Sequence, residues 1–171
     1  MADFNLYAPK LRKLEGGFVN DPSDKGGATM AGVTLNTYRR YYGESKTVND
    51  LKNISNAEWN HIMKTGYWDM VRGDEIRNQS IAEIFADWAV NSGPAGIRAF
   101  QRAQAIKADG VVGPKTINIL NAPNEEVIFN RIKSARESYY RKLAMTDPRQ
   151  SKFLGGWLNR LRQFNYVPSE S

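Results

Sequence analysis

Residues 14–29 read LEGGFVNDPSDKGGAT, and they mark the point at which a helical pattern gives way to a loop rich in turn residues. Before this stretch, apolar residues recur at spacings of 3, 4 and 3 over Phe4–Leu14, which predicts an amphipathic helix. Gly16 and Gly17 then end that helix, because glycine readily adopts the backbone conformation that closes a helical run. The dipeptides that follow are turn signals, so we expect an irregular segment with room for a short strand or hairpin up to Thr34.

Helical patterns dominate the rest of the chain. Ser80–Asn91 carries a broad apolar stripe typical of a buried helix, and Glu125–Leu143 carries the longest stripe, with spacings of 4, 3, 4 and 4. Shorter helices are predicted by periodicity and capping signals at Thr34–Gly43, Asn56–Thr65, Pro94–Gln104, Lys115–Leu120 and Ser151–Phe164. The sequence therefore predicts a mainly α protein with a small β or loop region after the first helix, and a frayed tail after Pro168.

The chain contains no low-complexity linker, and its clearest joint is the short Ser92-Gly93-Pro94 break. We therefore expect two lobes packed together, residues 1–94 and 95–171, rather than two free domains. The first lobe has 11 Lys and Arg against 12 Asp and Glu, and the second has 13 against 6. The +7 charge of the second lobe suggests an anionic partner such as nucleic acid, a wall polymer or a membrane surface, while a basic face that only aids solubility fits equally well.

The 171 residues include no cysteine and a single histidine, His61. This composition excludes structural disulfides, cysteine-based zinc sites and thiol nucleophiles, and it argues against His-rich metal sites and a Ser-His-Asp triad. We expect no metal and no cofactor. No run of about 18 apolar residues is present, so membrane insertion is not expected. The opening MADFNLYAPK lacks the basic and apolar segments of a secretory signal peptide.

Glu15 is the first candidate for chemistry. It stands at the carboxyl end of its predicted helix, where the helix dipole disfavours a negative charge, as suits a group that delivers a proton. The two glycines after it allow substrate or backbone to approach closely. General acid catalysis is one interpretation of Glu15, and a solvated or capping role is the other.

Two aspartates and two threonines follow Glu15 within the loop region. Carboxylates held a short loop apart are the minimum equipment for cleaving a glycosidic bond. Asp21 precedes a proline and is typical of a turn, whereas Asp24, beside two glycines, is better placed to point into a cleft. Thr29 and Thr34 can each orient a water or close a turn. The loop does not fit the spacing of a calcium-binding loop.

Aromatic and polar side chains further along are candidates for substrate binding. Tyr67 and Trp68 can stack on sugar rings, while Trp88, at helical spacing, is more typical of a core. Asp87 and Asn91 stand one helical turn apart and so share a face. They either line a cleft or form a buried, satisfied pair between the lobes.

The residues around this candidate chemistry resemble those of a known family. Residues 15–34 fit the pattern EGGFVNDPxDxGGxTxxGVT, which closely resembles the signature of glycoside hydrolase family 108, bacterial and phage N-acetylmuramidases that include the secretion activators. The similarity continues through GYW at 66–68, GD at 73–74 and FADWAVNSG at 85–93. It then extends into the family's peptidoglycan-binding-like part through DGVVGPKT at 109–116.

The resemblance implies a lysozyme-like fold and a substrate. Glu15 would be the catalytic acid, cleaving the β-1,4 bond between N-acetylmuramic acid and N-acetylglucosamine in peptidoglycan. By a looser similarity to phage-type lysozymes, Asp24 would be the base or cation stabiliser and Thr29 would help to place water, with Thr34 as the competing hydroxyl. Asp21, Thr34, Tyr67, Trp68, Asp87 and Asn91 complete the expected substrate-binding set. The second part would bind peptidoglycan or form the back wall of the cleft.

The expected setting follows from these points. A protein made in the cytoplasm without a signal peptide would act in the periplasm or cell wall after lysis, or after passage through a holin-like pore or a dedicated exporter. A prophage endolysin and a host enzyme that remodels the wall for secretion fit equally well. The alternatives are a non-catalytic peptidoglycan-binding protein and a basic nucleic-acid-binding domain. No nucleic-acid motif accompanies the basic charge, so no nucleic acid is expected as a partner.

Overall fold

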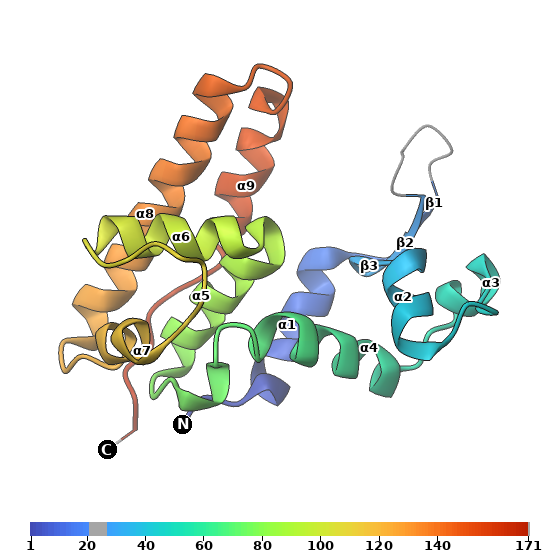
Figure 1. Ribbon diagram of the computed structural model, residues 1–171, viewed down its shortest axis with the longest axis horizontal. Helices are drawn as coiled ribbons and strands as arrows, with labels where there is room; N and C mark the ends of the chain where they lie inside the picture. Colours follow the sequence, from blue (N-terminus) through green and yellow to red (C-terminus); the bar gives the residue numbers. More distant parts are fainter. Residues whose placement is uncertain (21–26, 171) are drawn as a thin grey trace. The chain divides into compact units, whose positions relative to one another are not determined.

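The computed structural model describes residues 1–20 and 27–170 (Figure 1). The fold is mainly α and lysozyme-like, with a small β region after the first helix, as the sequence predicts. The chain forms two compact units. We call Asn5–Gly66 the sheet unit, and we call Met1–Phe4 together with Tyr67–Ser171 the helical unit.

The first helix is α1 (Phe4–Glu15), whose bounds lie within one residue of the predicted helix. All of it except Phe4 belongs to the sheet unit. Three short antiparallel strands follow in the order β1-β2-β3. They are β1 (Phe18–Asn20), β2 (Ala28–Met30) and β3 (Val33–Thr34). The predicted hairpin region is therefore confirmed as a three-stranded sheet.

Three helices and a π-helical turn complete this part of the chain. They are α2 (Leu35–Tyr42), α3 (Val48–Lys52), α4 (Asn56–Met63) and η1 (Lys64–Trp68). The cap of α4 is Ser55, because the Ser55 hydroxyl and the Glu58 carboxylate form a reciprocal capping box. The sequence reasoning missed α3, although Thr47 and Asp50 form the same kind of box there.

The helical unit is built around α5 (Gln79–Ser92), whose residues from Ser80 to Ala89 are all buried. The helix packs against α6 (Pro94–Ala103) and α8 (Glu125–Thr146), and enclosure on several sides explains its almost continuous burial. Phe85 of α5 and Phe100 of α6 meet edge to face, with ring centroids 5.0 Å apart. Trp88 is 1% exposed, so its predicted place in the core is confirmed.

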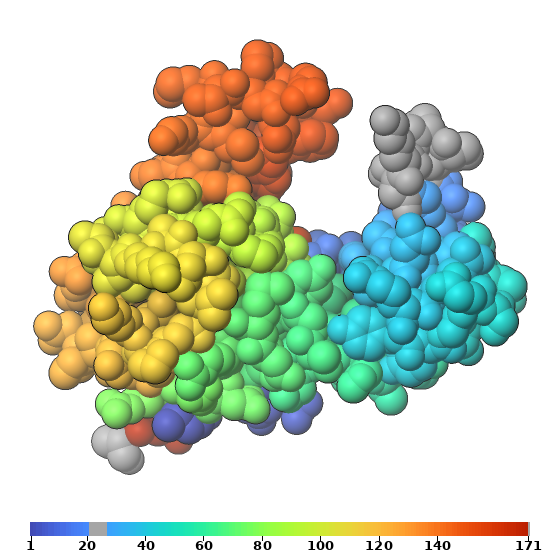
Figure 2. All heavy atoms as spheres, viewed as in Figure 1, coloured from blue at the N-terminus to red at the C-terminus, as the bar shows by residue number. Residues whose placement is uncertain are grey.

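The remaining elements lie around this core. They are η2 (Gly73–Glu75), α7 (Pro114–Leu120), η3 (Ser151–Phe153) and α9 (Leu154–Leu161). The helix predicted over Ser151–Phe164 is thus a short 3-10 turn followed by α9. Figure 2 shows α8 and α9, in orange and red, as one packed body, in agreement with their contacts.

The carboxyl-terminal tail is anchored rather than frayed as far as Ser169. Val167 donates its backbone N–H to the Ser80 hydroxyl at 2.9 Å, and the Ser169 hydroxyl donates to Glu125 at 2.6 Å. The hydrogen bond from Ser169 holds the pKa of Glu125 below its usual range. The prediction of a frayed tail is wrong up to Ser169. The partners that hold the tail lie far from it in sequence, so no local pattern indicates them.

Candidate active site

Glu15 is the last residue of α1, and its side chain is partly exposed. Gly16 follows with a φ of 79°, and its N–H bonds back to the Arg12 carbonyl at 3.1 Å. A left-handed glycine directly after a helix ends it without strain. The local sequence therefore presents a carboxyl group at a helix terminus, as predicted.

The β2–β3 turn is fixed to the chain that follows α1. Ala31 donates its backbone N–H to the Gly17 carbonyl at 3.1 Å, and its own carbonyl accepts from the indole N–H of Trp59 at 3.0 Å. Trp59 is 1% exposed, and the Arg12 guanidinium lies 5.0 Å from its ring centroid. Buried hydrogen bonds of this kind hold a backbone segment in one position.

Gly32, at the tip of that turn, lies directly against the Glu15 carboxyl group. A Cβ atom built on Gly32 would stand 2.7 Å from Glu15 Oε2 and 2.9 Å from its Cδ. Gly32 also has a φ of 86°, a conformation that residues with a side chain rarely adopt. Only glycine therefore fits both the turn and the space that the carboxyl group occupies.

Gly32→Ala should lower peptidoglycan hydrolysis by about tenfold or more, because the new methyl group displaces the carboxyl group by roughly an ångström. Gly43→Ala is the matched control, since Gly43 has a φ of 113° and a Cβ atom added there would meet nothing within 4 Å. Both variants should lose roughly 1 kcal/mol of unfolding free energy from backbone strain. Hydrolysis rates corrected for the folded fraction of each variant test this prediction. An equal loss of activity in Gly32→Ala and Gly43→Ala would show that Gly32 has no specific role in positioning Glu15.

The two threonines lie opposite each other in the sheet. Thr29 of β2 pairs with Thr34 of β3, and directly paired residues present their side chains on the same face. Thr34 caps α2: its hydroxyl accepts from the Thr37 N–H at 3.1 Å and donates to the Thr37 hydroxyl at 3.0 Å. The turn-closing interpretation of Thr34 is thus the one that this geometry supports. Asp21 and Asp24 lie outside the described residues.

Trp68 does not have the exposed face that sugar stacking needs. It is 0% exposed, donates its indole N–H to Asp74 at 2.8 Å and meets the Phe4 ring edge to face. Gly73 packs so closely on the indole that a Cβ there would stand 2.3 Å from the ring. We therefore correct the assignment of Trp68 to the substrate-binding set, because a ring enclosed on all sides belongs to the core. Tyr67 beside it is partly exposed.

Asp87 is buried as well, and it is the acceptor at the centre of a charged cluster. Arg136 donates to Asp87 Oδ2 at 2.7 Å, and Arg160 donates to both of its carboxylate oxygens at 2.9 and 2.7 Å. The Asp87 and Arg136 side chains are 0% exposed. The cleft interpretation of Asp87 is therefore corrected: its carboxylate is satisfied inside the helical unit. Asn91 is partly exposed and accepts a long hydrogen bond from Tyr140 at 3.4 Å.

Comparison with known proteins identifies the chain. The family model described as Glycosyl hydrolase 108 matches residues 8–93, about half of the sequence. The chain belongs to glycoside hydrolase family 108. A second model, described as a predicted peptidoglycan domain, matches residues 95–162. At the level of these families, the chain is a glycoside hydrolase of peptidoglycan, with peptidoglycan as its partner.

A solved structure is similar over nearly the whole length. SagA from Brucella abortus is 29% identical, with 94% of this chain and 90% of that chain covered and a TM-score of 0.77. No curated protein gave a match. The sequence resemblance to family 108 is thus confirmed by both family models and by this structure.

The Asp87 cluster links the two family segments. Asp87 lies in the family-108 segment, whereas Arg136 and Arg160 lie in the peptidoglycan segment, and all three belong to the helical unit. The division into lobes at residue 94 stays a prediction. Sequence reasoning missed both arginines, since neither stands in a recognisable motif. It also missed Gly32 and Trp59, although Gly32 stands in the family signature.

No metal site accompanies the described carboxylates. In residues 1–20 and 27–170, no three His, Cys, Asp or Glu side chains gather as a metal ion would require. Over the same ranges, no helix is long and apolar enough to cross a membrane.

Proposed function

We propose that this protein is a muramidase that cleaves the β-1,4 bond between N-acetylmuramic acid and N-acetylglucosamine, with Glu15 as general acid. One observation carries the proposal: within a family-108 segment, the Glu15 carboxyl group lies on Gly32 at a turn that Trp59 and Gly17 hold by hydrogen bonds. A catalytic carboxyl group needs this kind of fixed surrounding, because a displacement of about 1 Å can cost up to about 100-fold in rate.

In this mechanism Glu15 donates its proton to the glycosidic oxygen as the bond breaks. The sugar left behind carries positive charge at its anomeric carbon, which a second group must stabilise or supply with activated water. We assign that task to Asp24, with Thr29 orienting the water. The hydrolysis is complete when the water's oxygen bonds to the anomeric carbon and its proton passes to the base.

The same proposal assigns substrate contacts to partly exposed side chains. Tyr67 and Asn91 are the described candidates, and Asp21 is the third. Trp68 and Asp87 are left out because both are buried. Thr34 has a hydroxyl that already serves as a helix cap.

Analysis of the reducing ends tests the reaction. Purified peptidoglycan is digested, the products are reduced with borohydride, and the terminal sugar alcohols are identified by mass spectrometry. N-acetylmuramitol is the expected end. N-acetylglucosaminitol would instead show that the other glycosidic bond is cut. Sedimentation with the wall but no new reducing ends would favour a non-catalytic binding protein.

Variants of the paired Thr29 and Thr34 distinguish a role in positioning water from a role in capping α2. Thr29→Val should lower the turnover rate by about tenfold, because it loses one hydrogen bond in the transition state, with little change in stability. Thr34→Ala should lose about 1 kcal/mol of unfolding free energy, as expected for a removed N-cap, and keep its turnover rate. Urea unfolding and initial rates measure both variants. The reverse pattern would make Thr34 the catalytic hydroxyl.

We place the action of this enzyme at the cell wall or periplasm, where its substrate lies. Its delivery there would follow lysis, or passage through a holin-like pore or a dedicated exporter. Both an endolysin of a prophage and a wall-remodelling enzyme for secretion agree with this chemistry.

A further inference from the structure

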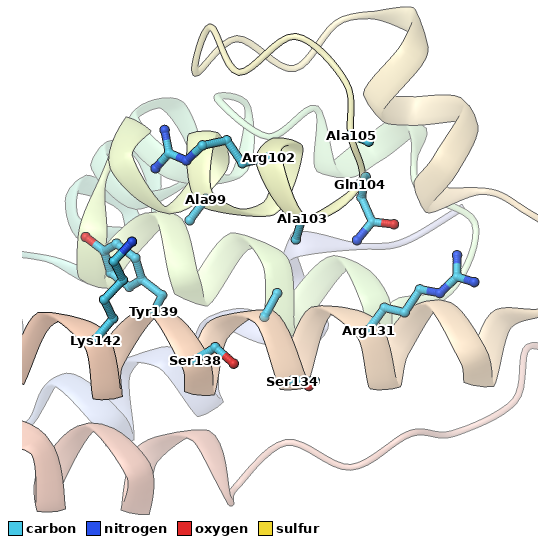
Figure 3. A pocket seen from close by; sticks show the side chains of 11 residues that line it. Ala99, Arg102, Ala103, Gln104, Ala105, Arg131, Ser134, Ser138, Tyr139 and Lys142 are labelled. Carbon is cyan, nitrogen blue, oxygen red and sulfur yellow. The ribbon is translucent and has the colours of Figure 1, made fainter.

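A groove of about 700 Å³ lies between α6 and α8, within the helical unit (Figure 3). All the residues that line it fall within 95–162, the segment matched by the predicted peptidoglycan domain. Glu15 is not one of the residues that line the groove, and it belongs to the sheet unit. The family match does not say which residues of this segment bind a ligand, and the groove is a candidate for that binding site.

Small side chains line the groove along its length. Ala99 and Ala103 extend from α6 toward α8 in Figure 3. On the α8 side, Ser134 and Ser138 stand one helical turn apart. Their hydroxyls can form hydrogen bonds with the peptide groups of a ligand. The walls therefore leave room for the side chains of a ligand.

Cations stand at the ends of the groove, with Lys142 at one end and Arg131 at the other in Figure 3. Among the described residues, these two and the neighbouring Arg102 form no ion pair, and no Asp or Glu lines the groove. Arg141, the residue next to Lys142, differs because it pairs with Glu137 at 3.0 Å. Cations around a concave surface with no acidic partner there attract an anionic ligand.

The dimensions of the groove favour a short peptide. Arg131 and Lys142 are eleven positions apart on α8, which is about 16 Å along a helix. An extended peptide of about five residues has the same length. Tyr139 supplies the aromatic ring of the described lining, and it already packs against Trp88 at 5.8 Å between centroids. Sugar binding normally needs a free aromatic face, so the groove is poorly equipped for a glycan.

We propose that the α6–α8 groove binds the peptide stem of peptidoglycan, with Arg131 and Lys142 pairing with its carboxylates. The stem is short and acidic, and the small side chains of Ala99 and Ala103 leave room for it in the groove. This inference rests on the proposed function only in that both concern peptidoglycan. It gives the second segment a stem-binding role beside the glycan-cleaving role of the first.

The test uses the Glu15→Gln protein and a synthetic stem tetrapeptide, so that no glycosidic bond is present to be cut. Binding is measured by calorimetry and located by amide chemical-shift changes. We expect saturable binding with shifts along α6 and α8. Arg131→Glu should weaken it at least tenfold, and Ala103→Trp, which fills the groove without changing charge, should do the same.

Lys115→Glu is the matched control, because Lys115 is exposed on α7, outside the groove, and the charge change is equal. It should change the affinity less than twofold. A stem whose carboxylates are amidated should bind at least tenfold more weakly. Tighter binding of a stem-free chitin tetrasaccharide, equal competition by polyphosphate, or equal effects of Arg131→Glu and Lys115→Glu would each overturn the proposal. Circular dichroism confirms that every variant is folded. Because the peptide contains no glycosidic bond, its binding can be measured even if the protein does not hydrolyse peptidoglycan.

Discussion

Glu15→Gln is expected to lower the rate of peptidoglycan hydrolysis by at least about 100-fold while leaving the protein folded. Glutamine has the same shape as glutamic acid, so it retains the contact with Gly32 at the β2–β3 turn. It cannot give up a proton to a leaving oxygen at neutral pH. Initial rates of reducing-sugar release from purified peptidoglycan measure the effect, and thermal unfolding confirms the fold.

Glu44→Gln provides the matched control for this experiment. Glu44 lies in the sheet unit and is exposed, so the same chemical change there should leave the rate unchanged. Glu15→Asp adds a second comparison: it keeps an acid but draws it back by about one methylene, which should also cost activity through misplacement. Full activity in Glu15→Gln would place the proton donor at another residue.

The second large effect is expected in stability. Asp87→Ala should lose about 3–5 kcal/mol of unfolding free energy, because it removes the carboxylate to which the buried Arg136 and its neighbour Arg160 both donate. A buried guanidinium without a counter-charge has lost its hydration, and Arg136 would keep only its hydrogen bonds to the neutral Tyr140 hydroxyl and Ile84 carbonyl. Urea unfolding followed by circular dichroism measures the loss.

Two further variants make this expectation testable even if Asp87→Ala fails to fold. Asp87→Asn keeps a hydrogen-bond acceptor but removes the charge, so it should be intermediate in stability. Glu137→Ala removes the partner of Arg141 from a half-exposed ion pair and should change stability by less than about 1 kcal/mol. Wild-type stability together with lost hydrolysis in Asp87→Asn would return Asp87 to the substrate cleft.

Local sequence determined most of the secondary structure and the position of Glu15. The apolar spacing of Phe4–Leu14 and the glycines after it were enough to predict α1 and its end, because helix periodicity and helix termination depend on neighbours in the chain. The same is true of α8, whose apolar stripe recurs every three or four residues. The capping box of α3 was also present in the sequence, but its short helix gave no periodic pattern to draw attention to it.

The sequence by itself determined the helices, the turn-rich loop after α1 and, through its motifs, the family. Only the tertiary structure decided that Gly32 lies against Glu15, that Trp68 is enclosed, and that Asp87 pairs with two arginines 49 and 73 positions away. Burial and ion pairing depend on which distant segments pack together, and no local pattern encodes that. The α6–α8 groove has the same origin, since its two sides come from helices separated by α7.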